Sequence, residues 1–415
     1  MVSKTSVPDE TVKQSSPKSD DATCLSILAP TRYPWRFNAP RSSRHKIENR
    51  NFAPMNYVSP KLEGITMFQP WPLKRFDLVH AFNRIPLTQT PFVISFESHM
   101  PRGFGIEHTG FYRFMTNRLL SDRCVGIGAI SNHARRIFLQ THRNHPQLDI
   151  LRRKLFLRYP NIPIENRRDD HDNAVMDPIK LVFVGNHFGR KGGCVGLRMA
   201  ELALERGISL EVSIISSMET GAASWTDPLT PGYFDRYLQM LRLPNVRHYQ
   251  NLPNGEVLAI LKRSHFSLLT TFCDTFGFSA IESMANYVPV IATRQAALPE
   301  FIAHGKNGIM LDMETNAIGE WKHIGANRST PEFADVFSRE IERMAEQSLE
   351  AVTTLARDRN RYAAMREAAY ATARTMFSAD DANRFWDDFY VEAWQAYHHH
   401  AGAHGYSQGP FTGSR

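Results

Sequence analysis

The sequence predicts an α/β protein made of two successive doubly wound domains, and two observations support this fold class. Short apolar runs of strand length alternate with helical patterns over residues 24–142, and the alternation restarts over residues 179–293. The runs are apolar throughout, which is typical of parallel strands covered by helices on both faces. A polar, proline-containing segment, residues 161–178, separates the two series and indicates a domain linker.

Each series divides into elements at its glycine, proline and charged residues. The first comprises strands at 24–30, 64–70, 76–82, 91–97 and 124–131, helices at 109–121 and 132–142, and an arginine-rich polar loop at 31–50. The second comprises strands at 179–185, 208–215, 245–250, 266–271 and 288–293, and helices at 194–207, 231–243, 254–264 and from about Ser279. Residues 331–397 carry a nearly continuous helical pattern.

These elements predict six regions along the 415-residue chain. The regions are a disordered tail (1–21), an N-terminal Rossmann-like domain (22–165), a linker (166–177), a C-terminal Rossmann-like domain (178–375), a terminal helix with an aromatic stripe (376–397) and a flexible tail (398–415). The N-terminal residues contain no segment of the signal-peptide type, and no apolar run is long enough to span a membrane. The four cysteines show no C-x-x-C spacing, so we expect free thiols in a reducing compartment.

The charge of the chain is unevenly distributed. Residues 22–158 contain 21 lysine and arginine residues against 7 aspartate and glutamate residues, a net charge of +14 within a chain of +7. A basic first domain attracts anions such as phosphates, acidic glycans or anionic lipid headgroups. Its aromatic residues do not alternate with the arginines as stacking platforms would, so we do not expect a nucleic acid as the partner.

Two loops of the second domain are candidate binding sites, because ligands of open α/β sheets bind at the carboxyl ends of the strands. The first is "GNHFGRKGG", in which Gly185 follows a strand and Arg190 and Lys191 precede two glycines. The glycines would let a ligand approach the backbone, and the two cations suit a diphosphate. The alternative is a solvated loop with two surface cations.

The second candidate is "CDTFGFSAIES", a turn between a strand and a helix. Gly277 permits close approach of an anion to the helix N-terminus, and Asp274 and Glu282 flank the turn. Ser279 and Glu282 also have the spacing of a capping box, in which the glutamate would satisfy only its own helix. On spacing alone, the capping box is the favoured interpretation.

Residues 274–312, "DTFGFSAIESMANYVPVIATRQAALPEFIAHGKNGIMLD", resemble the signature of the family-4 glycosyltransferases. These are retaining enzymes with the GT-B fold, in which two doubly wound Rossmann-like domains face each other across a cleft. The resemblance covers residues 178–312 well and the first domain only loosely. It implies that the terminal helix crosses back onto the first domain.

The resemblance also implies a function for single residues. Glu282 would bind the ribose hydroxyls of a nucleotide sugar, and Asp274 would lie beside the hydroxyls of the transferred sugar. Lys191 would neutralise the diphosphate, which would also meet the backbone of Gly277, Phe278 and Ser279. Three features depart from the family: Asp274 replaces the usual Glu, Asn186 replaces an Arg for which Arg190 is the candidate substitute, and residues 31–45 replace a glycine-rich loop.

In the first domain Glu97 aligns with a histidine that is frequent in the family, and His99 lies two positions further on. Either side chain could act on the acceptor hydroxyl or stabilise positive charge at the sugar. The alternative is that Glu97 pairs with a nearby arginine. We expect no metal and no other cofactor, because Lys191, Arg190 and the helix N-terminus can meet the charge of the leaving group. The D-x-D at 170–172 is interpreted as solvated charge.

The sequence therefore predicts a metal-independent, retaining transferase of the hexosyltransferase type, acting from a nucleotide-sugar donor onto a glycan or lipid-linked acceptor. We expect it to work in surface polysaccharide or glycolipid synthesis, in the cytoplasm and as a peripheral protein on the inner face of the membrane. Two alternatives stay open: a nucleotide-sugar epimerase of the same fold, which would need no acceptor, and a non-catalytic protein that binds sugar nucleotides.

Overall fold

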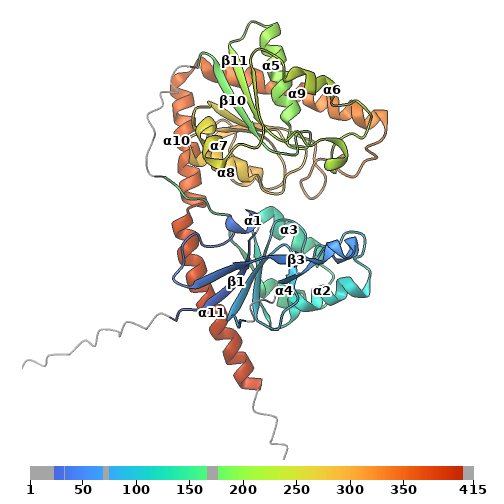
Figure 1. Ribbon diagram of the computed structural model, residues 1–415, viewed down its shortest axis with the longest axis vertical. Helices are drawn as coiled ribbons and strands as arrows, with labels where there is room; N and C mark the ends of the chain where they lie inside the picture. The colour runs from blue at the N-terminus through green and yellow to red at the C-terminus, as the bar shows by residue number, and fades with distance from the viewer. Residues whose placement is uncertain (1–22, 32, 69–73, 166–175, 405–415) are drawn as a thin grey trace, which may run out of the picture.

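The computed structural model describes residues 23–31, 33–68, 74–165 and 176–404. The tail predicted at 1–21, most of the predicted linker and the D-x-D at 170–172 lie outside these ranges. The described chain forms two α/β domains that are stacked along the long axis of the molecule, each with a six-stranded parallel sheet (Figure 1). The predicted fold class is therefore confirmed.

The sheet of the first domain has the strand order β2-β1-β5-β7-β8-β9. Its strands are β1 (Ser26–Pro30), β2 (Lys46–Arg50), β5 (Leu78–Phe82), β7 (Phe92–Phe96), β8 (Cys124–Ala129) and β9 (Leu155–Leu157). Alternate side chains of one strand enter different cores, since Phe92 and Ile94 pack on one face and Val93 packs on the other. Burial on both faces explains why these runs show no polar alternation.

Helices and a small sheet complete this domain. One face of the large sheet is covered by α2 (Gly110–Leu120), α3 (Asn132–Thr141) and α4 (Leu148–Lys154). The small sheet contains β3 (Phe52–Pro54), β4 (Ile65–Phe68) and β6 (Ile85–Pro86). The short helices are α1 (Tyr33–Arg36), η1 (Met55–Tyr57) and η2 (Pro60–Leu62).

One local prediction for the first domain was wrong. Segment 31–50 is not a loop throughout, because it contains α1 and the edge strand β2, which pairs in parallel with β1. An edge strand has one neighbour and a partly exposed surface, so β2 tolerates the polar side chains that concealed it. The strand predicted at 64–70 is present as β4, and it pairs with β3 and β6 in the small sheet.

The sheet of the second domain has the order β12-β11-β10-β13-β14-β15, again with parallel neighbours. Its strands are β10 (Ile179–Val184), β11 (Leu210–Ile215), β12 (Val246–Tyr249), β13 (Phe266–Leu269), β14 (Val290–Thr293) and β15 (Gly308–Leu311). The helices between them are α5 (Gly193–Glu205), η3 (Gly221–Ala223), α6 (Asp235–Met240), α7 (Asn254–Lys262), α8 (Phe278–Ala285) and η4 (Leu298–Glu300).

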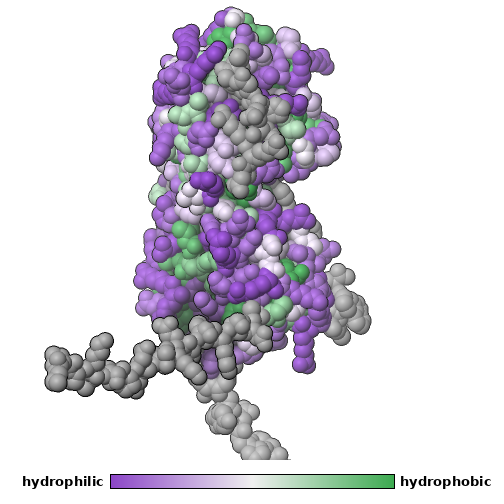
Figure 2. Space-filling view, turned by 90° about the vertical axis from the view of Figure 1, so that its left-hand side faces the viewer, coloured by the Kyte–Doolittle hydropathy of each residue, from purple (hydrophilic) through white to green (hydrophobic). Residues whose placement is uncertain are grey.

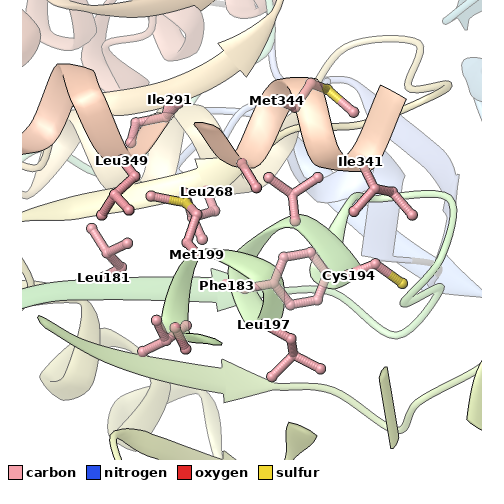
Figure 3. Packing of buried hydrophobic residues seen from close by; sticks show 14 of the residues in the cluster. Leu181, Phe183, Cys194, Leu197, Met199, Leu268, Ile291, Ile341, Met344 and Leu349 are labelled. Carbon is pink, nitrogen blue, oxygen red and sulfur yellow. The ribbon is translucent and has the colours of Figure 1, made fainter. Parts of the chain in front are cut away.

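One face of this sheet packs against α5 and the long helix α9 (Pro331–Ala356). Figure 3 shows Leu181 and Phe183 of β10 in one cluster with Met199 of α5 and with Met344 and Leu349 of α9. The other face carries α8 and α10 (Arg359–Met376), whose apolar side chains share a second core cluster. The sheet is thus sandwiched between two helical layers, as the apolar strands predicted.

The last helix, α11 (Ala379–His404), runs down beside the first domain (Figure 1). Its Trp386 and Tyr390 are buried against Leu25 and Ile27 of that domain. The buried His80 of β5 lies between the domain and the helix, with Nδ1 2.7 Å from the Tyr390 hydroxyl, and burial lowers the pKa of His80 to about 3. The helix also continues to His404, so residues 398–404, which the sequence placed in the flexible tail, are helical.

The surface seen in Figure 2 is mostly hydrophilic, and its apolar side chains form separate patches. In the described part of the chain, no helix combines the length and the apolar character needed to cross a bilayer.

Candidate functional site

The loop between β10 and α5 is shaped by two of its glycines. Gly192 has φ +84°, and a Cβ there would lie 2.0 Å from the carbonyl oxygen of Thr270, so the loop meets the end of β13 at backbone distance. A Cβ at Gly185 would lie 2.6 Å from Cδ of Lys191. The lysine side chain therefore folds back over Gly185, and this path brings its ammonium to the neighbouring loop after β13.

That ammonium pairs with Asp274, a contact that the sequence did not predict. Lys191 Nζ lies 3.0 Å from Asp274 Oδ2, and Oδ1 accepts the N–H groups of Phe276 and Gly277 at 3.4 and 3.2 Å. Burial alone would raise the pKa of Asp274, but the charges of Lys191 and Arg190 and these hydrogen bonds outweigh it and lower the pKa. Asp274 is therefore a buried, ionised carboxylate that faces a cation.

Arg190 lies in the same loop but does not extend into open space. Its guanidinium donates to the carbonyl oxygen of Cys273 and lies 4.6 Å from the ring centroid of Trp225, and the residue is 7% exposed. It therefore ties the β10–α5 loop to the β13–α8 loop and adds positive charge behind Asp274. Lys191 is the more accessible of the two predicted cations.

Helix α8 begins at Phe278, and Gly277 is its N-cap with φ +89°. Ser279 is thus already inside the helix, and the capping box that its spacing with Glu282 suggested does not form. The start lies one residue earlier because only glycine adopts this backbone conformation without strain, and Asp274 accepts the N–H of the capping residue. Within the described residues, no hydrogen-bond partner approaches the carboxylate of Glu282.

Glu282 instead lines a cavity of about 460 Å³ between the two domains. The first domain contributes Arg36, Phe37 and Arg41, and the ring of Phe37 lies 4.5 Å from that of Phe278. Burial raises the pKa of Glu282 to about 7, against the opposing charges of Arg41 and Lys191. The cavity is therefore lined by an unpaired carboxylate, an aromatic ring and arginines, a set that can hold hydroxyl groups, a flat ring and phosphate.

Arg36, Phe37 and Arg41 were not among the predicted site residues. They lie in the segment that replaces the family's glycine-rich loop, after the carboxyl end of β1. The signal that could have identified them is that position, since the first βα connection of a doubly wound sheet opens toward the ligand crevice.

Glu97 follows β7 and contacts the second domain. Its Oε2 accepts the hydroxyl of Thr275 at 3.3 Å, and its Oε1 accepts Asn83 Nδ2 at 2.8 Å. Arg102 Nη1 lies 3.4 Å from the same Oε1, so the arginine pairing that the sequence left open is present. Thr275 directly follows Asp274 in the chain. The Glu97–Thr275 contact therefore places Glu97 of the first domain near Asp274 of the second.

His99 does not line the cavity that contains Glu282. It borders a second cavity of about 380 Å³ together with Gln140 and Arg143 of the first domain and Ile318 of the second. Its ring packs edge-on against Phe104, with centroids 5.2 Å apart. Burial is the main cause that lowers the pKa of His99, so the imidazole is neutral at pH 7 and can accept a proton.

Glu300 also joins the two domains, and the sequence did not predict this function. Its carboxylate accepts the N–H groups of Asn132 and His133 at 2.8 and 2.7 Å, at the start of α3, and the hydroxyl of Tyr159 at 2.9 Å. A carboxylate at a helix N-terminus is favourable because it meets free N–H groups and the positive end of the dipole. The contact holds the carboxyl ends of the two sheets face to face.

Among the described residues, no three or more His, Cys, Asp or Glu side chains are grouped so that they could hold a metal ion. All four cysteines lie in the described part of the chain, and all are free.

Comparison with known proteins places these features in a family context. Residues 233–319 match the family model described as Glycosyl transferases group 1. D-inositol 3-phosphate glycosyltransferase from Thermobifida fusca (strain YX) is 28% identical over 137 residues, which are 33% of this chain and 31% of that protein. The protein of the same name from Corynebacterium diphtheriae is 24% identical over 136 residues, 32% of this chain and 30% of that protein. The aligned part thus spans about a third of these relatives.

Solved structures extend the likeness to most of the chain. Anabaena HepE in complex with UDP-glucose has a TM-score of 0.51 and 14% identity, and the comparison covers 89% of this chain and 100% of that one. The same protein in complex with UDP has a TM-score of 0.52 and 15% identity. At this level of identity the likeness concerns the fold. The chain therefore has the GT-B fold of glycosyltransferases, and its residues 233–319 carry a Glycosyl transferases group 1 domain.

Proposed function

We propose that this protein is a glycosyltransferase that moves a sugar from a nucleotide-sugar donor to a glycan or lipid-linked acceptor, with retention of anomeric configuration and without a metal ion. The observation that carries the proposal is the carboxylate of Glu282, which has no partner among the described residues and lines the interdomain cavity near the charge of Lys191. The relatives named as glycosyltransferases and the neighbour bound to UDP-glucose support the same donor class.

In the proposed reaction, the bond between the anomeric carbon and the diphosphate oxygen breaks, a bond forms to the oxygen of an acceptor hydroxyl, and the proton of that hydroxyl passes to the departing diphosphate. Lys191 and the free N–H groups at the start of α8 offset the charge that develops on the diphosphate. Asp274 binds hydroxyls of the transferred sugar, and Glu282 binds those of the ribose. Glu97 borders the sugar site through Thr275, and His99, a neutral base, serves the acceptor side.

We further propose that the first domain docks on anionic lipid at the cytoplasmic face of a membrane, in polysaccharide or glycolipid synthesis. The support is its net charge and the exposed arginines of the helical layer, which are Arg113, Arg135, Arg136, Arg152 and Arg153. Sedimentation with vesicles of phosphatidylglycerol should exceed that with phosphatidylcholine and should decline between 50 and 300 mM salt, roughly as charge screening requires. Equal sedimentation with both lipids would argue against this docking.

The donor site is tested by the melting temperature of the protein with UDP, GDP and ADP. A ligand that binds only the folded state stabilises it, by about 2.7 kcal/mol at 100 times its Kd. At least one nucleoside diphosphate should raise the melting temperature of the wild type. Glu282→Gln and Lys191→Met should each reduce the shift. The first removes the carboxylate that accepts hydrogen bonds from the ribose hydroxyls, and the second removes the positive charge that offsets the diphosphate.

The control is Lys306→Met, which removes an exposed lysine outside the site. The proposal fails if the wild type responds to none of the three diphosphates, or if the Glu282 and Lys191 variants respond as the control does. Transfer with retention is then checked by NMR of the product's anomeric proton. Turnover of the donor without any acceptor would instead support an epimerase.

A further inference from the structure

Trp225, between β11 and α6, is an exposed residue within a buried segment. Its residue surface is 53% exposed, whereas Ser224, Thr226 and Asp227 are 2%, 0% and 0% exposed. The chain on both sides of the indole is therefore part of the packed interior, while the indole itself is presented to solvent.

The segment around Trp225 is held in place from both sides. Arg328 Nη1 donates to the carbonyl oxygens of Ser224 and of Asp227, the latter at 2.9 Å. The buried Asp227 carboxylate accepts the N–H of Gly221 at 3.1 Å, and a Cβ at Gly189 would lie 2.3 Å from its Oδ2. The segment is thus packed directly onto the β10–α5 loop, and the indole is presented from a fixed base.

The orientation of the indole is set by the same loop. The Arg190 guanidinium covers one face of the ring at 4.6 Å and is itself fixed by the carbonyl of Cys273. Since one face lies on Arg190 and about half of the residue surface is exposed, the opposite face of the ring is open to solvent.

Polar side chains lie beside the indole. The ring of His187 lies edge-on to the indole with centroids 6.4 Å apart, and His187 Nδ1 lies 3.1 Å from Glu219 Oε2. The side chains of His187 and Glu219 are 33% and 41% exposed. A pyranose ring has an apolar C–H face and hydroxyls at its edge, so a rigid aromatic face with a polar rim is complementary to it.

We propose that Trp225 is a carbohydrate-binding platform that stacks on the C–H face of a pyranose ring, with His187 and Glu219 bonding to its hydroxyls. The inference rests on the proposed glycosyltransferase function and names a further binding residue for it. The pyranose is either the sugar of the donor or a ring of the acceptor glycan. The chemistry is the same for both, and the two arms of the experiment distinguish them.

The experiment compares wild type with Trp225→Ala and Trp225→Phe, and Leu204→Ala is the control because it removes another exposed apolar side chain, near the end of α5. The donor arm measures by calorimetry how much more tightly UDP-glucose binds than UDP, and GDP-mannose than GDP. The acceptor arm measures saturation-transfer NMR of methyl glucoside, methyl mannoside and N-acetylglucosamine without any nucleotide.

We expect Trp225→Ala to lose about tenfold in affinity in one arm, as expected for the loss of one aromatic face. Trp225→Phe should lose less, because a smaller aromatic face remains, and the control should lose nothing. A loss confined to the donor arm assigns the donor sugar, and a loss confined to the acceptor arm assigns the glycan. If Trp225→Ala equals wild type in both arms, the platform is refuted.

The outcome is separable from that of the proposed function. UDP and GDP carry no pyranose, so their binding should be unchanged by Trp225→Ala. Failure of both nucleotides to bind the wild type counts against the proposed donor site, while the acceptor arm still decides for or against Trp225. An equal loss of UDP and UDP-glucose binding in Trp225→Ala overturns the proposal, because Trp225 would then only maintain the conformation of the loop between β10 and α5.

Discussion

Glu282 is the residue whose chemistry depends most on its surroundings. In a capping box its carboxylate would accept backbone N–H groups and stay ionised, but the helix begins at Phe278 and leaves it facing the cavity. Burial without a hydrogen-bond donor penalises the charged form, which is why its pKa rises to about 7. A ligand that donates hydroxyls to this carboxylate would favour the ionised form and would be bound better above that pH.

The raised pKa predicts a pH-dependent stability. In the unfolded chain the carboxyl titrates near 4.5, so between pH 4.5 and about 7 the folded protein binds more protons than the unfolded one. Stability from this group therefore falls as the pH rises through that window. Glu282→Gln lacks the effect, so its free energy of unfolding relative to wild type should rise between pH 5 and pH 8, as measured by urea denaturation. Glu350→Gln, at an exposed position in α9, is the control, and a flat difference would contradict the pKa.

The Lys191–Asp274 pair predicts a coupled loss of stability. Lys191→Met leaves Asp274 with two backbone N–H groups and the charge of Arg190, and we expect a cost of about 1.5–3 kcal/mol, typical of a hydrogen bond to a charged group. Asp274→Asn should cost less in the Lys191→Met background than in the wild type, with a coupling of about 0.5–3 kcal/mol. Additive losses in a denaturation double-mutant cycle would show that the two side chains do not interact.

At the scale of elements, the connection from β13 to α8 depends on one glycine. Gly277 has φ +89°, and a Cβ there would lie 2.7 Å from Leu298 Cδ2 and 2.8 Å from Leu269 Cδ2. The residue therefore lets the chain turn into the helix and packs the turn tightly on the core. Close packing, rather than approach of a ligand, is its visible requirement.

Gly277→Ala should accordingly destabilise the protein by about 1–3 kcal/mol, from the strained backbone and the displaced leucines. Gly255→Ala is the matched comparison, because Gly255 is exposed in α7, needs no unusual φ, and a Cβ there would meet no atom within 4 Å. That change should be neutral or stabilise by about 0.5–1 kcal/mol. Equal free energies of unfolding for the two variants would contradict this account of the turn.

At the scale of the whole molecule, the two domains are held in one arrangement by three sets of contacts. Helix α11 packs on the first domain, Glu97 meets Thr275, and Glu300 caps the start of α3. The Glu97 and Glu300 contacts are small and polar, and contacts of this kind can open and close around a ligand. The Glu300 contact is well placed to bias that equilibrium, since three donors converge on one carboxylate.

Glu300→Ala should favour an open arrangement, because Asn132 and His133 lose their shared acceptor. Small-angle scattering should then give a larger radius of gyration than for wild type, and Glu300→Gln should fall between the two because it keeps one acceptor oxygen. Glu332→Ala, at an exposed position in α9, is the control. An unchanged radius of gyration in Glu300→Ala would mean that the other interdomain contacts set the arrangement without Glu300.

Local sequence signals were sufficient for much of this molecule. Apolar runs located the strands that are buried on both faces. The turn before α8 identified Asp274 as a candidate site residue, because a strand, a glycine and a helix follow one another there. The edge strand β2 was missed, since a strand with one neighbour needs no apolar pattern. The spacing of Ser279 and Glu282 suggested a cap that the backbone of Gly277 prevents.

The sequence by itself determined the two parallel sheets and the position of two candidate loops after β10 and β13, because burial patterns and turn residues act over short distances. Only the tertiary structure decided which side chains of the first domain meet the second. Glu97 and Thr275 are 178 positions apart, and Glu300 and Asn132 are 168 apart. Such contacts leave no periodicity in the chain, since they arise only when the carboxyl ends of two separately folded sheets are brought face to face.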